Sequence, residues 1–162
     1  MANPYAALLG KQDPLTVLAE TPRRLTSIAE LLGDAGLAKA WAPGKWTGST
    51  ILCHLADCEI AFGFRYRQAL AEPHHVMQTF DQDAWAKPYP LSRDLALETF
   101  SALRRWNLDL LRTVGENVME KPVSHPERGE MKFRDMIQLI VGHDLNHLQQ
   151  LEKLASERSP LA

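Results

Sequence analysis

Apolar residues recur at helical spacing along most of the chain, and this period is the strongest constraint on its fold. The clearest case lies near the C-terminal end, where inward positions follow one another in steps of three and four. These positions are Met136, Ile140, His143, His147, Leu151 and Leu154. Shorter stripes of the same period occur upstream, and no segment shows a convincing strand-like alternation. The pattern predicts an all-α protein.

Helix-capping residues and prolines divide the chain into four long helices. Asp13-Pro14 and Thr21-Pro22 both resemble an N-cap followed by proline in the first helical position, where the missing N–H costs nothing. We expect the first long helix to begin at the second of these pairs. The predicted helices are Thr21–Gly33, Thr47–Pro73, Ser92–Gly115 and Met131–Ser156.

The segment between the second and third helices is long enough to cross the end of a bundle. Residues 73–90 contain three prolines and no clear period, so we predict an ordered connection. The fold class that follows is an all-α four-helix bundle with a long crossover connection between helices 2 and 3. For the third helix the expected core face is Leu95, Thr99, Leu103, Trp106 and Leu110.

Length and charge limit the classes of function. A chain of 162 residues fits one domain, here 1–162, with 45% hydrophobic and 23% charged residues. Its net charge is -2, and the sequence has no basic stripe of the kind that nucleic-acid-binding proteins carry. We therefore expect no nucleic-acid partner. No stretch is apolar enough to span a membrane and no secretory leader is evident, which favours a cytoplasmic location.

Three histidines stand at positions that suit a metal ion. His143 and His147 are four residues apart, so their rings lie on one helix face, and both replace core residues in the apolar stripe. A buried polar side chain costs about 1–3 kcal/mol unless it finds a partner. If His54 of the second helix faces them, three neutral nitrogens surround one ion and leave positions open for water or substrate. The alternative is three satisfied core histidines without a metal.

Other side chains could complete or tune such a site. Cys58 follows His54 by four residues, so it is either a fourth ligand or, more simply, a small buried apolar residue. Cys53 and Cys58 point to different helix faces and cannot form a disulfide with each other. Asp57 and Asp144 are candidates to accept the second N–H of a metal-bound histidine, and otherwise they are solvated carboxylates.

Several polar residues in the connections have simpler interpretations. The adjacent His74 and His75 are expected at the surface, and His125, before a proline, is expected to be structural. Asp81 and Asp83 could supply an acid or base at the mouth of the bundle, although aspartates in loops usually cap turns. No catalytic side chain is identified beyond an ion that activates water or a thiol.

Three segments together resemble a known family. The run 44–57, which reads GKWTGSTILCHLAD, is similar to the second-helix signature of the DinB-like (YfiT-like) metalloprotein superfamily. The run 142–150, GHDLNHLQQ, is similar to its closing His-x-x-x-His motif, and 124–130, SHPERGE, fits its usual turn. A lone His-x-x-x-His would be weak, but its place at the end of an all-helical chain with His54 upstream is specific.

The resemblance implies a four-helix bundle that binds a divalent ion, nickel or zinc, through His54, His143 and His147. It also implies a small-molecule substrate and a homodimer. Family members include transferases of low-molecular-weight thiols such as bacillithiol, mycothiol-dependent maleylpyruvate isomerases, and proteins described only as metal-dependent hydrolases. An ion of this kind can activate either a thiol or water, so both chemistries remain open. The alternative is a non-catalytic bundle, stabilised by metal or serving as an interaction module.

Overall fold

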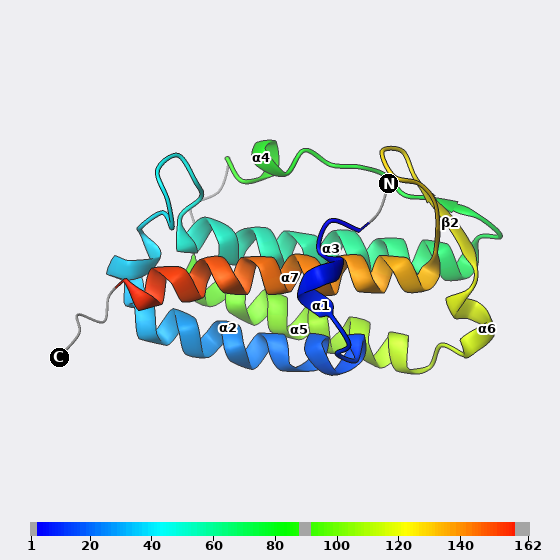
Figure 1. Ribbon diagram of the computed structural model, residues 1–162, viewed down its shortest axis with the longest axis horizontal. Coiled ribbons are helices and arrows are strands. Elements are labelled where there is room, and N and C mark those ends of the chain that lie inside the picture. Colours follow the sequence, from blue (N-terminus) through cyan, green and yellow to red (C-terminus); the bar gives the residue numbers. More distant parts are fainter. Residues whose placement is uncertain (1–2, 88–91, 158–162) are drawn as a thin grey trace.

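Four long helices pack side by side and form the body of the protein, as the sequence predicts (Figure 1). The structure is a computed structural model that describes residues 3–87 and 92–157. Helices α3 and α5 run in one direction, and α2 and α7 run in the other. The four-helix bundle with its long connection between the second and third long helices is therefore confirmed. The bounds are α2 Pro14–Leu37, α3 Gly48–Ala71, α5 Arg93–Arg112 and α7 Phe133–Ser156.

Capping side chains set most of the predicted helix starts. Thr47 Oγ1 accepts a hydrogen bond from the Thr50 N–H at 3.1 Å, and Ser92 Oγ accepts one from the Leu95 N–H at 3.4 Å. Both satisfy an N–H group that the first helical turn leaves without an intrahelical partner. Helices α3 and α5 therefore begin where the sequence predicts.

The first long helix begins earlier than expected. Asp13, not Thr21, is its N-cap and accepts the Thr16 N–H at 2.8 Å. Thr21 is buried inside α2 and donates its hydroxyl to the Val17 carbonyl at 2.9 Å, so its hydroxyl is satisfied without ending a helix. Gly33 does interrupt the helix, with φ 57°, but helical residues continue beyond this kink to Leu37.

The predicted core face of α5 is wrong. Leu95 and Trp106 have 63% and 65% of their surface exposed. The inward face instead carries two polar side chains, Arg104 and Asn107, among apolar ones, and polar residues conceal an inward face from an apolar-period analysis. The buried residues of α5 are Ala96, Phe100, Arg104, Asn107, Leu108 and Leu111.

A small sheet at one end of the bundle was not expected from the sequence (Figure 1). Strand β2 (Pro122–His125) pairs with β1 (His75–Val76) in parallel and with β3 (Gly129–Lys132) antiparallel. These strands are two to four residues long, too short to show a period of two. The turn 126–128 between β2 and β3 lines a cavity together with Cys58, Phe62 and Arg65 of α3.

Three short helices complete the described fold, and two of them approach the bundle surface near its centre. The connection after β1 runs back along the bundle and includes α4, Gln82–Trp85 (Figure 1). Helix α1, Ala6–Leu9, crosses α7, and Tyr5 packs so closely that a Cβ on Gly142 would lie 2.4 Å from Tyr5 Cβ. The third, α6, spans Glu116–Met119. No helix in the described parts of the chain could cross a membrane.

Candidate metal centre

His54, His143 and His147 converge between α3 and α7, and we call them the histidine cluster. The Nε2 atoms of His54 and His143 lie 2.9 Å apart across the two helices. The three ring centroids are 4.5–5.0 Å from one another. Trp46 covers the cluster, with its ring 4.7 Å from that of His54 and stacked at 6.2 Å on that of His147. The structure thus brings together all three histidines that the sequence singled out.

Burial keeps His54 and His147 neutral. Desolvation, together with the neighbouring His143 and His147, lowers the pKa of His54 to about 2. Desolvation and His143 lower the pKa of His147 to about 4, although its bond to Gln150 opposes the shift. A neutral imidazole offers one nitrogen lone pair, which is the form that binds a metal ion.

Each histidine of α7 has a polar neighbour at Nδ1, which leaves Nε2 to face the cluster. His147 Nδ1 lies 2.9 Å from Gln150 Oε1. His143 Nδ1 lies 3.6 Å from Asp144 Oδ1, and both of these buried atoms lack a hydrogen-bond partner in the described chain. Asp144 is one of the two carboxylates that the sequence offered as partners for a metal-bound histidine. The structure places Asp144 beside His143, and the side-chain amide of Gln150 lies beside His147 Nδ1.

Cys58 lies in the same group of potential ligands. Its Sγ is 3.5 Å from His54 Nε2 and 4.0 Å from His143 Nε2. One ligand atom from each of His54, Cys58 and His143 lies within 4.8 Å of the other two. Burial, followed by the nearby Asp144 and Glu59 carboxylates, raises the pKa of the Cys58 thiol well above its ordinary value. In this environment the thiol is protonated unless a cation is bound.

Asp57, the other carboxylate that was proposed to support a histidine, faces a different part of the molecule. It lines a groove between α3 and α5 together with Cys53 and Ser92. Burial raises its pKa. Its carboxylate makes no hydrogen bond to a histidine in the described residues.

The loop candidates occupy separate places. Asp81 Oδ1 accepts the N–H groups of Asp83 and Ala84 at 3.0 Å and so caps α4, as expected of a loop aspartate. Asp83 lines a cavity beside the histidine cluster. His74 is exposed, 3.6 Å from Glu130.

His75 is buried, although a surface position was expected for it. It is only 4% exposed. Its Nδ1 lies 2.9 Å from Glu72 Oε2. Strand β1 turns His75 inward and its neighbour Val76 outward, because neighbouring residues of a strand point to opposite sides, whereas His74 precedes the strand.

Sequence reasoning missed a second buried polar group, formed by Glu59, Arg104, Asn107 and Asp144, which we call the ionic network. Arg104 Nη2 donates to Glu59 Oε1 at 2.6 Å and to Asp144 Oδ2 at 2.7 Å. Asn107 Nδ2 donates to Glu59 Oε2 at 3.0 Å. Despite burial, the two carboxylates raise the pKa of Arg104, and Arg104 helps to hold the pKa of Asp144 below its ordinary value. In a sequence, an arginine at helical spacing looks like a residue exposed to solvent. No local signal therefore identified Arg104 as buried.

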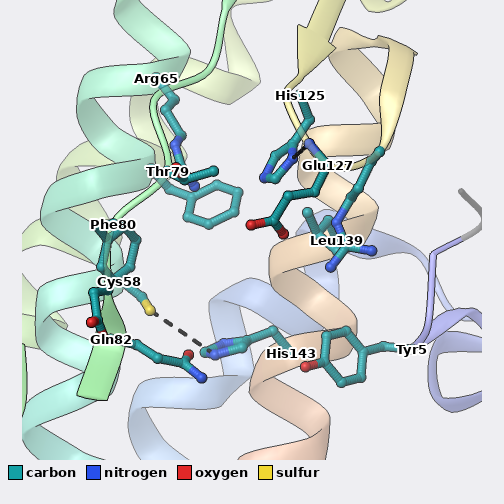
Figure 2. Close-up of a pocket in the computed structure, with 13 residues that line it drawn as sticks. Tyr5, Cys58, Arg65, Thr79, Phe80, Gln82, His125, Glu127, Leu139 and His143 are labelled. Atoms are coloured by element: carbon teal, nitrogen blue, oxygen red, sulfur yellow. Dashed lines mark hydrogen bonds between the residues drawn. The ribbon is translucent and has the colours of Figure 1, made fainter. Parts of the chain in front are cut away.

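Two cavities, each of about 400 Å³, open on either side of His143. The first, which we call the α3 cavity, reaches Cys58, Arg65 and His125 (Figure 2). The second reaches His147 and Trp46. Tyr5, Gln82 and His143 border both. The histidine cluster therefore has access to space for small molecules on two sides, as a catalytic site requires.

Comparison with known proteins identifies the class. The model of the DinB superfamily matches residues 18–151, which is most of the chain. This protein belongs to the DinB superfamily, and the resemblance seen in its sequence is confirmed.

Individual relatives are consistent with this membership. The chain is 27% identical over 143 residues to "Putative metal-dependent hydrolase OB0782" of Oceanobacillus iheyensis, a match that covers 87% of this chain and 83% of that protein. It is 28% identical over 152 residues to "Putative metal-dependent hydrolase YfiT" of Bacillus subtilis, with 90% and 84% covered. Both relatives are named for metal-dependent hydrolysis.

The fold also matches a solved structure. YfiT from Bacillus subtilis superposes with a TM-score of 0.84 at 23% sequence identity, covering 89% of this chain and 85% of that one. That protein is described as having an unusual four-helix bundle topology. In the present protein α3 and α5 run parallel and are joined by a long connection.

Proposed function

We propose that this protein is a metal-dependent enzyme in which His54, His143 and His147 hold a divalent ion, nickel or zinc. The observation that carries the proposal is the convergence of three imidazoles at the border of two cavities. A divalent ion bound by three nitrogens and open to a cavity lowers the pKa of a water molecule or thiol beside it, and so supplies a nucleophile near neutral pH.

The protein's own residues prepare the site for such an ion. His54 Nε2 and His143 Nε2 lie 2.9 Å apart, a distance at which one neutral ring can donate a proton to the other, and a shared cation would instead use the lone pairs of both rings. Asp144 beside His143 and Gln150 beside His147 fix the rings so that Nε2 faces inward. Trp46 excludes water from one side of the cluster.

Two reaction types fit, hydrolysis of a small molecule and transfer of a low-molecular-weight thiol. The relatives' names favour hydrolysis. The second cavity favours transfer, because two separate spaces beside one ion suit two organic substrates. A third candidate is a closed structural site in which Cys58 completes the coordination, and its Sγ distances support that possibility.

Metal analysis of purified variants tests the ligand set. We expect about one ion per chain in the natural protein, lost in His54→Ala and His147→Ala and retained in Cys58→Ser. His74→Ala is the matched control, because this exposed histidine lies outside the cluster. X-ray absorption should show three nitrogen neighbours with exchangeable oxygen. Sulfur in the coordination shell, together with metal loss in Cys58→Ser, would instead establish the closed site.

The proposal includes a cytoplasmic homodimer. Four large apolar side chains on α3 and α5 are exposed and would be covered by a second copy: Ile60, Phe64, Leu95 and Trp106. Sedimentation equilibrium of the natural protein and of Trp106→Glu tests the dimer. A natural protein that sediments as a monomer at micromolar concentration would contradict it.

A further inference from the structure

Arg65 is a buried cation without a carboxylate partner among the described residues. Only 6% of its surface is exposed, yet none of the described acidic side chains approaches its nitrogens within 4.0 Å. Its Nη2 donates to the Gln78 carbonyl, and its guanidinium stacks on Phe62 and Phe80, with ring centroids 5.0 and 5.6 Å from Cζ. A buried charge is costly when it lacks a counter-ion. Arg104, by contrast, has two carboxylates.

This guanidinium lies in the wall of the α3 cavity, close to a second donor. Figure 2 shows Arg65 and His125 extending into the same space from α3 and from the sheet. His125 Nδ1 accepts the Glu127 N–H at 3.2 Å, so its proton is on Nε2. Burial, together with the Arg65 and Arg128 charges, lowers the pKa of His125 and keeps the ring neutral. The cavity is therefore bordered by two arginines, Arg65 and Arg128, and by a fixed N–H donor.

Two acidic side chains also border the α3 cavity, but neither compensates Arg65. Asp81 is exposed, and its Oδ1 is occupied by the N–H groups at the start of α4. Glu127 is exposed to solvent and forms no ion pair with Arg65. Carboxylates that are exposed to solvent and form no ion pair with Arg65 leave the buried guanidinium available to an anion that enters the cavity.

We propose that Arg65 and His125 bind a carboxylate group of the substrate in the α3 cavity. This inference rests on the proposed function, because the other end of the substrate reaches the histidine cluster. Arg65 follows Cys58 by seven residues on α3, so the two positions are separated by about 10 Å along the helix. The substrate class is a small carboxylic acid whose reactive group lies roughly that far from its carboxylate. The planar guanidinium, already oriented by Phe62 and Phe80, suits a bidentate contact.

Calorimetric titration with two hydroxamates tests the proposal separately from the metal site. Suberic acid monohydroxamate carries a metal-binding hydroxamate at one end of an alkyl chain and a carboxylate at the other, and octanohydroxamate lacks the carboxylate. We expect zinc-loaded protein to bind the first at least about tenfold more tightly. Arg65→Met should abolish this preference while keeping the packing on Phe62 and Phe80. Arg65→Lys should retain part of it.

Arg112→Met is the matched control, since Arg112 is an exposed arginine at the end of α5, and it should leave the preference unchanged. Equal binding of the two hydroxamates to the natural protein would overturn the carboxylate site and leave the metal proposal intact. If neither hydroxamate binds, octanoate and octanamide are titrated into metal-free protein. Binding of octanoate alone, lost in Arg65→Met, would support the carboxylate site, and any other result in that titration would overturn it.

Discussion

The histidine cluster and the ionic network lie next to each other in the bundle, and they differ in how their polar atoms are satisfied. In the network, Arg104 is bound by two carboxylates and Glu59 by Asn107. In the cluster, two ring nitrogens face each other at 2.9 Å, and His143 Nδ1 has no hydrogen-bond partner in the described chain. A network in which opposite charges pair with one another is a structural element, whereas facing imidazole nitrogens beside cavities indicate a binding site.

Asp144 connects the two regions. Its Oδ2 accepts a hydrogen bond from Arg104 Nη2 at 2.7 Å, and its Oδ1 lies 3.6 Å from His143 Nδ1. Arg104 of the network thus helps to keep Asp144 ionised, while the second oxygen of Asp144 orients His143, a proposed metal ligand. The comparison predicts that the network determines the stability of the fold and that the cluster determines metal affinity, with Asp144 affecting both.

The largest expected effect is acid destabilisation of the metal-free protein. His54 and His147 have folded pKa values of about 2 and about 4, below the ordinary value of 6.5. As the pH falls, both histidines take up protons at a higher pH in the unfolded state than in the folded state. Their stabilising effect is therefore complete above pH 6.5 and is lost as the pH falls toward 4. We expect a loss on the order of 5 kcal/mol over this interval, measured by urea unfolding. In His54→Ala/His147→Ala the loss should be much smaller, and an identical pH profile would contradict the assignment.

Removing the arginine of the network should cost nearly as much. Arg104→Met leaves Glu59 and Asp144 as buried charges without a cation, which we expect to lower the free energy of unfolding by about 3–5 kcal/mol at neutral pH. Urea unfolding measures it, with Arg112→Met as the exposed control at less than about 0.5 kcal/mol. Restoration of stability by adding Glu59→Gln and Asp144→Asn to Arg104→Met would show that the uncompensated charges cause the loss.

Asp144→Asn tests the connection between the two regions. We expect metal affinity to fall about 10–100-fold, because the residue that orients His143 loses its charge. Glu59→Gln is the matched control, since it removes the other acid of Arg104 without approaching a histidine, and its metal affinity should stay within about threefold. Competition titration with a chromogenic chelator measures both. Equal losses in the two variants would mean that the whole network, not the Asp144–His143 contact, tunes the site.

The smallest effect is expected at Gln150. Gln150→Ala removes the neutral partner of His147 Nδ1 and should weaken metal binding about threefold to tenfold. The exposed neighbour Gln149 provides the control Gln149→Ala, which should change nothing in the same chelator titration. A larger loss in Gln150→Ala than in Asp144→Asn would reverse the order of importance proposed for the two contacts.

The sequence by itself determined the bundle, the starts of α3 and α5, and the common helix face of His143 and His147. These features depend on local rules, namely the helical period, capping hydrogen bonds and the spacing of residues on one helix face. The first helix start was wrong because Asp13-Pro14 and Thr21-Pro22 carry the same local signal, and only burial distinguishes them.

Tertiary structure alone decided the pairing of Arg104 with Glu59 and Asp144, the inward face of α5 and the position of Arg65 in a cavity wall. Each of these depends on which helix faces which, and charged residues at helical spacing look the same whether they face solvent or a buried partner. The cavities beside His143 arise likewise from Tyr5, Gln82 and the turn after β2, segments far apart in sequence that meet only in the folded protein. Contacts between distant segments leave no local pattern in a single sequence, so the network and the carboxylate site emerged only from the structure.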